Sequence, residues 1–129
     1  MFTVQQIEDA HAKVKSGADF PKYVQEIKTI GVEAFETWVK DSHTDYLGKD
    51  NYKTSSLPQY DNLEISDKTN AEEFTARLKN HQQGKTDYVT FCKDCAETGI
   101  EKWIVDLRAM TCIYYDKAGK EILVENIPE

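Results

Sequence analysis

The chain has 129 residues, of which 40% are hydrophobic and 30% are charged, and its formal net charge is −7. This length fits one domain, and this composition is that of a globular protein rather than a disordered one. The acidic balance and the scattered Lys and Arg residues argue against nucleic acid or anionic membranes as partners. No apolar run is long enough to span a bilayer and the N-terminus lacks a signal pattern, so we expect a cytoplasmic protein that binds no membrane.

Two helices are predicted at the start of the chain. Thr3 and Gln6 have the spacing of a capping box, and apolar residues then recur at helical spacing until Ser16-Gly17. A second helix is predicted to begin after Asp19, a capping residue, and to end at Gly31. Its apolar stripe consists of Phe20, Tyr23, Val24, Ile27 and Ile30.

Three strands and a connector follow. After the second helix the apolar period changes from helical to alternating, which predicts a strand over 32–39. Segments 43–47 and 52–55 predict a hairpin, and the polar stretch 55–69 predicts a connector with one short strand at 63–65. The first strand places Phe35, Thr37 and Val39 on one face and Ala34, Glu36 and Trp38 on the other.

The second part of the chain has the same order of patterns. Asn70 is predicted to cap a third helix, and Asp87 a fourth that ends at Gly99. Strands are predicted over 100–108, 111–115 and 121–127, the last two joined by a short hairpin loop that ends at Gly119. The stripe of the fourth helix consists of Tyr88, Phe91, Cys92, Cys95 and Ala96, and the next strand places Trp103, Val105 and Leu107 on one face.

These two parts correspond at a fixed offset, because the pattern that includes Gly31 recurs 68 positions later around Gly99. The fold prediction is a single α+β domain with four main helices packed on an antiparallel sheet of five or six strands. We interpret the correspondence as an internal repeat of α-α-β-β-β halves, and chance similarity of helix–strand units is the alternative. The ranges are 1–129 for the domain, 1–54 and 70–127 for the halves, and 55–69 for the connector.

Cys92-x-x-Cys95 has a spacing that zinc sites and redox pairs use. A redox pair favours a thiol at a helix N-terminus, whereas Cys92 lies five residues after Asp87. A zinc site needs four ligands, and no second ligand pair follows. We therefore favour packing of both thiols in the core, with metal binding and redox chemistry as alternatives, and we predict no metal and no cofactor.

The three histidines are the candidates for chemistry. His43 lies at a strand start beside Asp41, Thr44 and Asp45, where it could act as a general base, although most such histidines are only exposed. His11 and His81 each lie near the end of a helix, where they could stabilise the helix terminus or line a pocket between the halves.

A binding face is predicted on the sheet, away from the helices. Trp38 and Tyr114 are expected there, and its mixture of aromatic and acidic residues suits a cationic or amphipathic partner. The alternative is that the connector folds over this face and buries Trp38. The predicted face consists of Ala34, Glu36, Trp38, Ile104, Asp106, Cys112 and Tyr114.

Two long segments, HQQGKTDYVTFCKDCAETGIEKWIVDL and MTCIYYDKAGKEILVENIP, carry a resemblance to a known family. They resemble the YbcV/YdfO-like family of uncharacterised bacterial proteins, often labelled "phage envelope protein". The resemblance extends to the opening FTVQQIEDAHAKVKSGADFPKY and implies an α+β fold. It implies no activity, cofactor or catalytic residue.

The functional prediction is a non-enzymatic binding or regulatory module of bacterial or phage-associated origin. Its expected partner is a protein or a small molecule, and a homodimer is a further expectation. The alternative is a small enzyme with a histidine in a pocket, either His43 or the His11/His81 pair.

Overall fold

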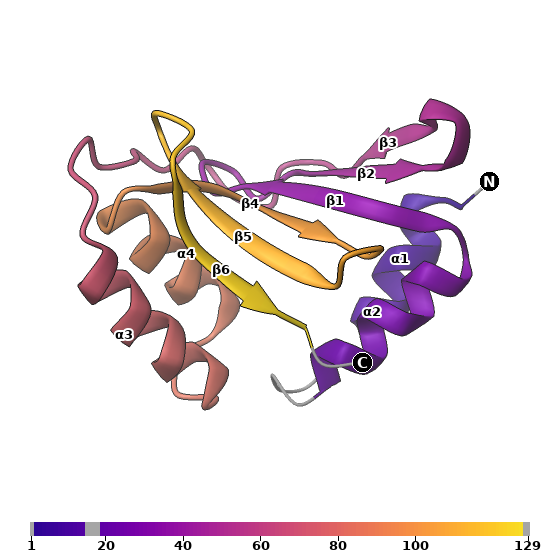
Figure 1. Cartoon of the computed structure of the whole chain (residues 1–129), viewed down its shortest axis with the longest axis horizontal. Helices are drawn as coiled ribbons and strands as arrows, with labels where there is room; N and C mark the ends of the chain where they lie inside the picture. Colours follow the sequence, from indigo (N-terminus) through magenta and orange to yellow (C-terminus); the bar gives the residue numbers. More distant parts are fainter. Residues whose placement is uncertain (1, 15–18, 128–129) are drawn as a thin grey trace.

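The computed structural model describes residues 2–14 and 19–127, which form four α-helices, six strands and one 3₁₀ turn (Figure 1). The predicted α+β class is therefore confirmed, and the sheet has the larger of the two expected strand numbers. In chain order the elements are α1 (Val4–His11), α2 (Phe20–Thr29), β1 (Val32–Trp38), β2 (Thr44–Gly48), η2 (Lys49–Asn51), β3 (Lys53–Ser55), α3 (Ala71–Gln82), α4 (Tyr88–Glu97), β4 (Ile100–Asp106), β5 (Thr111–Asp116) and β6 (Glu121–Asn126).

Helices α1, α3 and α4 begin where side chains replace the missing backbone partners of a first turn. Thr3 and Gln6 form the full capping box at α1, each side chain accepting a hydrogen bond from the other's backbone N–H. Asn70 accepts from Glu73 at α3 in the same way, and the Asp87 side chain caps α4. The end predicted for α1 at Ser16-Gly17 lies outside the described residues.

All neighbouring strands in the sheet are antiparallel, in the order β3-β2-β1-β4-β5-β6. At its centre Glu36 on β1 lies opposite Ile104 on β4, and these two positions are 68 apart in the sequence. A pseudo-twofold axis therefore passes between them, and residues 68 positions apart take equivalent places on its two sides.

The irregularities of the two halves also correspond. The register of β1 with β2 shifts between Val32 and Ala34, and that of β4 with β5 shifts between Ile100 and Lys102, again 68 positions later. Each half has the order α-α-β-β-β. A common origin of the halves stays a prediction.

The core lies between the helices and one face of the sheet (Figure 1). Trp103 on β4 contacts Tyr88 and Phe91 of α4, and Tyr46 on β2 faces Tyr23 of α2. Both helix pairs thus cover the same face. The strand residues predicted for this face, Phe35, Thr37, Val39, Trp103, Val105 and Leu107, are all buried.

The prediction that Cys112 and Tyr114 lie on the opposite face is wrong. Tyr114 pairs with Trp103, and Cys112 pairs with Val105. Because directly opposed residues of an antiparallel pair point to the same face, both side chains point toward the helices. Tyr114 packs 4.9 Å from the ring of Phe74 on α3 and is only 6% exposed.

The connector between the halves contains no strand at 63–65, which corrects that prediction. Its backbone donates to the turn after β1, from Leu63 N–H to Lys40 O at 2.6 Å, and to α4, from Ser66 N–H to Ala96 O at 2.8 Å. Tyr60, Leu63 and Ile65 pack against the core. The connector therefore packs on the helix side and does not bury Trp38.

Candidate functional site

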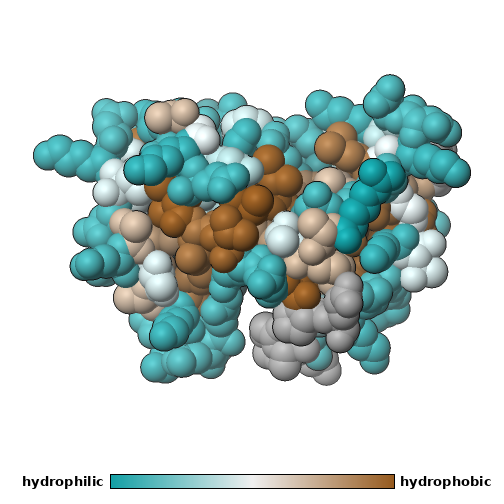
Figure 2. All heavy atoms as spheres, viewed as in Figure 1, coloured by the Kyte–Doolittle hydropathy of each residue, from teal (hydrophilic) through white to brown (hydrophobic). Residues whose placement is uncertain are grey.

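The face of the sheet that points away from the helices is the candidate site, and we call it the open face. Five neighbouring strands, from β2 to the edge strand β6, align side chains in three rows across the sheet. Figure 2, viewed as in Figure 1, shows apolar atoms gathered where Figure 1 draws β5 and β6. The rows are Leu47, Ala34, Asp106, Thr111 and Asn126; Asp45, Glu36, Ile104, Ile113 and Val124; and His43, Trp38, Lys102, Tyr115 and Glu121.

The middle row carries an apolar stripe. Ile104, Ile113 and Val124 lie directly opposite one another on β4, β5 and β6. The two isoleucines are half-buried by their neighbours, and Val124 is 51% exposed. The three residues therefore form a continuous apolar strip that is partly open to solvent.

The third row holds a lysine between two aromatic rings. The Nζ atom of Lys102 lies 4.8 Å from the ring centre of Trp38 and 5.5 Å from that of Tyr115. It also donates to Glu36 Oε2 at 3.1 Å. We call these four residues the lysine clamp, and none of them is fully buried.

At the end of the same row His43 pairs with a carboxylate. Its Nδ1 lies 2.6 Å from Asp41 Oδ1, and its ring stacks on Trp38 with the planes 10° apart. Asp41 Oδ1 also accepts the backbone N–H of His43 at 3.0 Å. Burial by itself would raise the pKa of Asp41, but these hydrogen bonds from His43 hold the pKa below its ordinary value.

Asp45, the predicted companion of His43, has a different role. Its carboxylate accepts from Ser55 Oγ at 2.6 Å and from Trp38 Nε1 at 3.4 Å. It therefore orients the indole ring of the open face. Asp41, which the sequence also places beside His43, is the carboxylate that contacts it, from a position two residues earlier where an aspartate can accept from the backbone.

The pseudo-twofold axis shows which of these side chains lack a counterpart in the other half. It relates the third row to the first, so that the positions of Trp38 and Lys102 correspond to Asp106 and Ala34. The turns also correspond, since Ser42 and Met110 both have positive φ, at 61° and 55°. The second turn has Ala109 and Thr111 at the positions equivalent to Asp41 and His43, and there Asp106 Oδ1 accepts the backbone N–H groups of Arg108 and Ala109 instead. The clamp and the Asp41–His43 pair thus occur in one half and have no counterpart at the equivalent positions of the other.

Comparison with protein families gives one assignment. A family described as a protein of unknown function (DUF1398) matches residues 8–126. The chain belongs to this DUF1398 family. No curated protein matches it.

His11 and His81 of this DUF1398 protein do not form a pair. His11 contacts Tyr23 edge-on at 5.1 Å, whereas His81 stacks on Phe91 at 4.5 Å. Each histidine thus packs on the second helix of its own half, and Figure 1 draws α1 and α3 at opposite ends of the sheet. A joint pocket for the two is therefore not formed.

The three thiols lie in the core. Cys92 and Cys95 are fully buried on the sheet-facing side of α4, and Cys112 is 7% exposed on β5. Burial raises the pKa of all three, that of Cys112 to about 12. They are therefore neutral thiols near neutral pH, unlike the thiolates that bind metals or attack disulfides.

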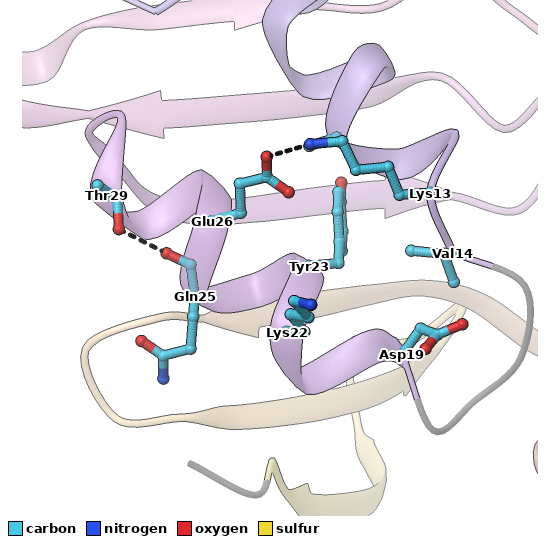
Figure 3. A pocket seen from close by; sticks show the side chains of 9 residues that line it. Lys13, Val14, Asp19, Lys22, Tyr23, Gln25, Glu26 and Thr29 are labelled. Atoms are coloured by element: carbon cyan, nitrogen blue, oxygen red, sulfur yellow. Dashed lines mark hydrogen bonds and ion pairs between the residues drawn. The ribbon is translucent and has the colours of Figure 1, made fainter.

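Two shallow hollows on the surface of the described residues lie near the helices and near the turn after β4. Figure 3 shows the larger, about 460 Å³ between α1 and α2, where Lys13 bonds Glu26 at 2.8 Å beside Tyr23. The other, about 300 Å³, is lined by residues that include Lys28 and Arg108. Neither hollow is lined by a histidine. Within residues 2–14 and 19–127, no helix is long and apolar enough to cross a membrane.

Proposed function

We propose that this DUF1398 protein is a non-enzymatic binding module whose open face takes a basic, amphipathic segment of another protein. The observation that carries the proposal is the apolar stripe set within an acidic face. The open face carries four carboxylates, on Glu36, Asp45, Asp106 and Glu121, against two lysines, Lys102 and, opposite Leu47 on β3, Lys53. An apolar stripe with a carboxylate excess around it complements a partner with apolar side chains and flanking positive charges.

The dimensions of the stripe suit a helix. Ile104, Ile113 and Val124 span two strand spacings, which is about 10 Å. Residues i and i+7 of a helix are separated by nearly the same distance, about 10.5 Å. Apolar residues at positions i, i+3 or i+4, and i+7 of one helix can therefore contact all three.

Charge argues against a second copy of the chain as the occupant. The chain carries a net charge of −7, and two open faces brought together would oppose their carboxylate excesses. Self-association through this face would therefore be disfavoured, most strongly at low salt, where charge repulsion is least screened. A basic partner gains from the same charges.

The test uses a helical peptide of Leu and Lys with one apolar stripe, and a control peptide in which Glu replaces every Lys. Calorimetric titration should show binding of the basic peptide, weakened by salt, and none of the acidic one. Val124→Lys should weaken binding by roughly ten-fold, because it places a like charge in the stripe. Val89→Lys is the matched control, since Val89 is 46% exposed on α4 and not on the open face.

Equal binding of the two peptides, or equal affinities of the two lysine variants, would contradict the proposal. Concentration-dependent dimerisation lost in Val124→Lys would identify the occupant as a second copy and would also overturn it.

A second candidate function rests on the Asp41–His43 pair. A carboxylate that fixes Nδ1 of a histidine leaves Nε2 to exchange protons with a substrate, as in general acid–base catalysis. The contact of 2.6 Å has this geometry, but neither surface hollow includes the pair. Hydrolysis of a small activated ester faster in the wild type than in His43→Gln would favour the enzyme over the binding module.

The proposal includes a cytoplasmic location and a YbcV/YdfO-like, bacterial or phage-associated origin. The long segments quoted in the sequence analysis support this origin. Fractionation of the native host should recover the protein with the cytosol, and recovery with virions or membranes would contradict that location.

A further inference from the structure

The lysine clamp points to a ligand class for one end of the open face. We propose that Trp38, Tyr115 and Glu36 form a binding site for an ammonium group, which Lys102 fills when no partner is bound. This inference rests on the proposed function only in assigning that ammonium group to the partner.

The contacts of Lys102 define what the site accepts. Two aromatic rings lie 4.8 and 5.5 Å from the charged nitrogen, and a carboxylate oxygen lies 3.1 Å from it. Aromatic faces attract a cation, and rings combined with a carboxylate are how proteins hold alkylated ammonium groups. The protein's own lysine is thus a stand-in that shows the size and charge of the ligand.

The clamp residues are open to exchange. The side chains of Lys102 and Glu36 are 24% and 22% exposed, and Trp38 and Tyr115 are half-buried. A lysine side chain has a flexible four-carbon stem, so that Lys102 can turn its charge into solvent while the rings stay in place. The pseudo-twofold equivalent of Lys102 is Ala34, so the same place in the other half of the sheet is occupied without a lysine.

Displacement makes Lys102 a competitor for the site. An incoming ammonium group must replace contacts that already exist, so the affinity for a free cation is low in the wild type. Without Lys102, Glu36 loses its cation and both rings become available. Removal of the lysine is therefore expected to increase affinity, which is the opposite of what a merely structural lysine would do.

The experiment titrates the protein with tetramethylammonium chloride and follows the indole N–H signals of Trp38 and Trp103 by NMR. Sodium chloride at equal concentration controls for ionic strength. Lys102→Met should show a saturable shift of the Trp38 signal, with an affinity roughly ten-fold above that of the wild type. Trp103, 8% exposed on the helix side, should not respond and reports that the fold is intact.

Tyr115→Leu in the Lys102→Met background should remove the saturable shift, because it deletes one of the two rings. If Lys102→Met is not folded, Lys102→Ala carries the test, since alanine is the residue at the equivalent position. The inference is overturned if the folded variant responds no more than the wild type, or no more to tetramethylammonium than to sodium.

These results are separable from the proposed function. Val124 lies in the middle row, outside the clamp, so Val124→Lys tests the stripe alone. Saturable tetramethylammonium binding, together with a basic peptide unaffected by Val124→Lys, would overturn the proposed function and keep the site. Peptide binding that depends on Val124, without a response of Lys102→Met to tetramethylammonium, would keep the proposed function and overturn the ammonium site.

Discussion

Cys112 illustrates how a single buried residue contributes to the response of the protein to alkaline pH. Its thiol points toward the helices from β5, and burial raises its pKa from 9.0 to about 12. In the unfolded chain the same thiol ionises near pH 9. Because the folded pKa is the higher one, the contribution of this thiol to stability is complete below pH 9. It is lost as the pH rises toward the folded pKa.

We therefore predict an alkaline loss of stability that Cys112→Val reduces. Between pH 9 and about 12 this one thiol should lower the free energy of unfolding by roughly 1 kcal/mol per pH unit. Urea unfolding of both proteins at neutral pH and above pH 9 measures the difference. If the two curves stay parallel across this range, Cys112 does not titrate as described.

Asp41 should give the opposite response, in acid. Its folded pKa lies below its ordinary value of 3.8, so its contribution is complete above that value and is lost as the pH falls through the folded pKa. Asp41→Asn should consequently be less stable than the wild type at neutral pH, and the gap should narrow in acid. Asp61→Asn, an exposed change in the connector, is the control. A gap independent of pH would show that Asp41 acts through packing alone.

At the level of elements, the ends of α2 and α4 offer a matched comparison. Gly31 and Gly99 follow the two helices at equivalent positions, and both have positive φ, at 112° and 89°. A Cβ on Gly31 would meet only the Phe2 side chain, at 3.5 Å. A Cβ on Gly99 would lie 2.8 Å from Thr69 Cα and 2.9 Å from Lys68 O, both in the connector backbone.

Gly99→Ala should therefore destabilise the protein more than Gly31→Ala. At Gly84, φ is 79° and an added Cβ would meet no atom within 4 Å. Gly84→Ala therefore measures only the cost of a positive φ for an alanine, about 1 kcal/mol of unfolding free energy. The clash with the connector should add roughly 1–3 kcal/mol at Gly99. Thermal or urea unfolding of the three variants measures this order, and equal losses would mean that the connector yields without cost.

Most of the elements could be predicted from the sequence, because caps and periodicity are local signals. Asn70 and Asp87 marked helix starts, and the change of period marked β1 and β4. The face of Tyr114 was predicted wrongly because the register of β5 depends on the turn before it. In that turn Met110 adopts a positive φ, which is uncommon for a methionine and could not be expected from the sequence. The strand expected at 63–65 failed because its backbone bonds to a turn instead of a neighbouring strand.

The candidate site was predicted only in part. Trp38 was expected on the open face, but the clamp joins residues from β1, β4 and β5, and cross-strand neighbours follow from strand order and register. Neither is a local property of the chain. Lys102 and Tyr115 therefore had no signal that singled them out.

For the whole molecule, the shared sheet makes the halves depend on one another. The β1–β4 pair joins them, and the core on the helix face is continuous across that pair. Ile27→Ala, a change at a fully buried position in α2, should lower the free energy of unfolding by about 2–5 kcal/mol. The loss should appear equally in far-ultraviolet circular dichroism and in the fluorescence of Trp38 and Trp103, each read in the variant that lacks the other. Separate midpoints would show that the halves unfold independently.

The position of the pseudo-twofold axis, between Glu36 and Ile104, has a consequence for how the open face can vary. Two identical subunits related by such an axis would carry the same side chains at both ends of their joint surface. Every substitution would then occur at both ends, whether it strengthened or weakened binding there. Within one continuous chain the ends are free to differ, and here one end has Leu47 and Ala34 where the other has Tyr115 and Lys102. Covalent joining of the halves therefore permits a surface whose two ends differ, so that a bound segment can be held in one orientation.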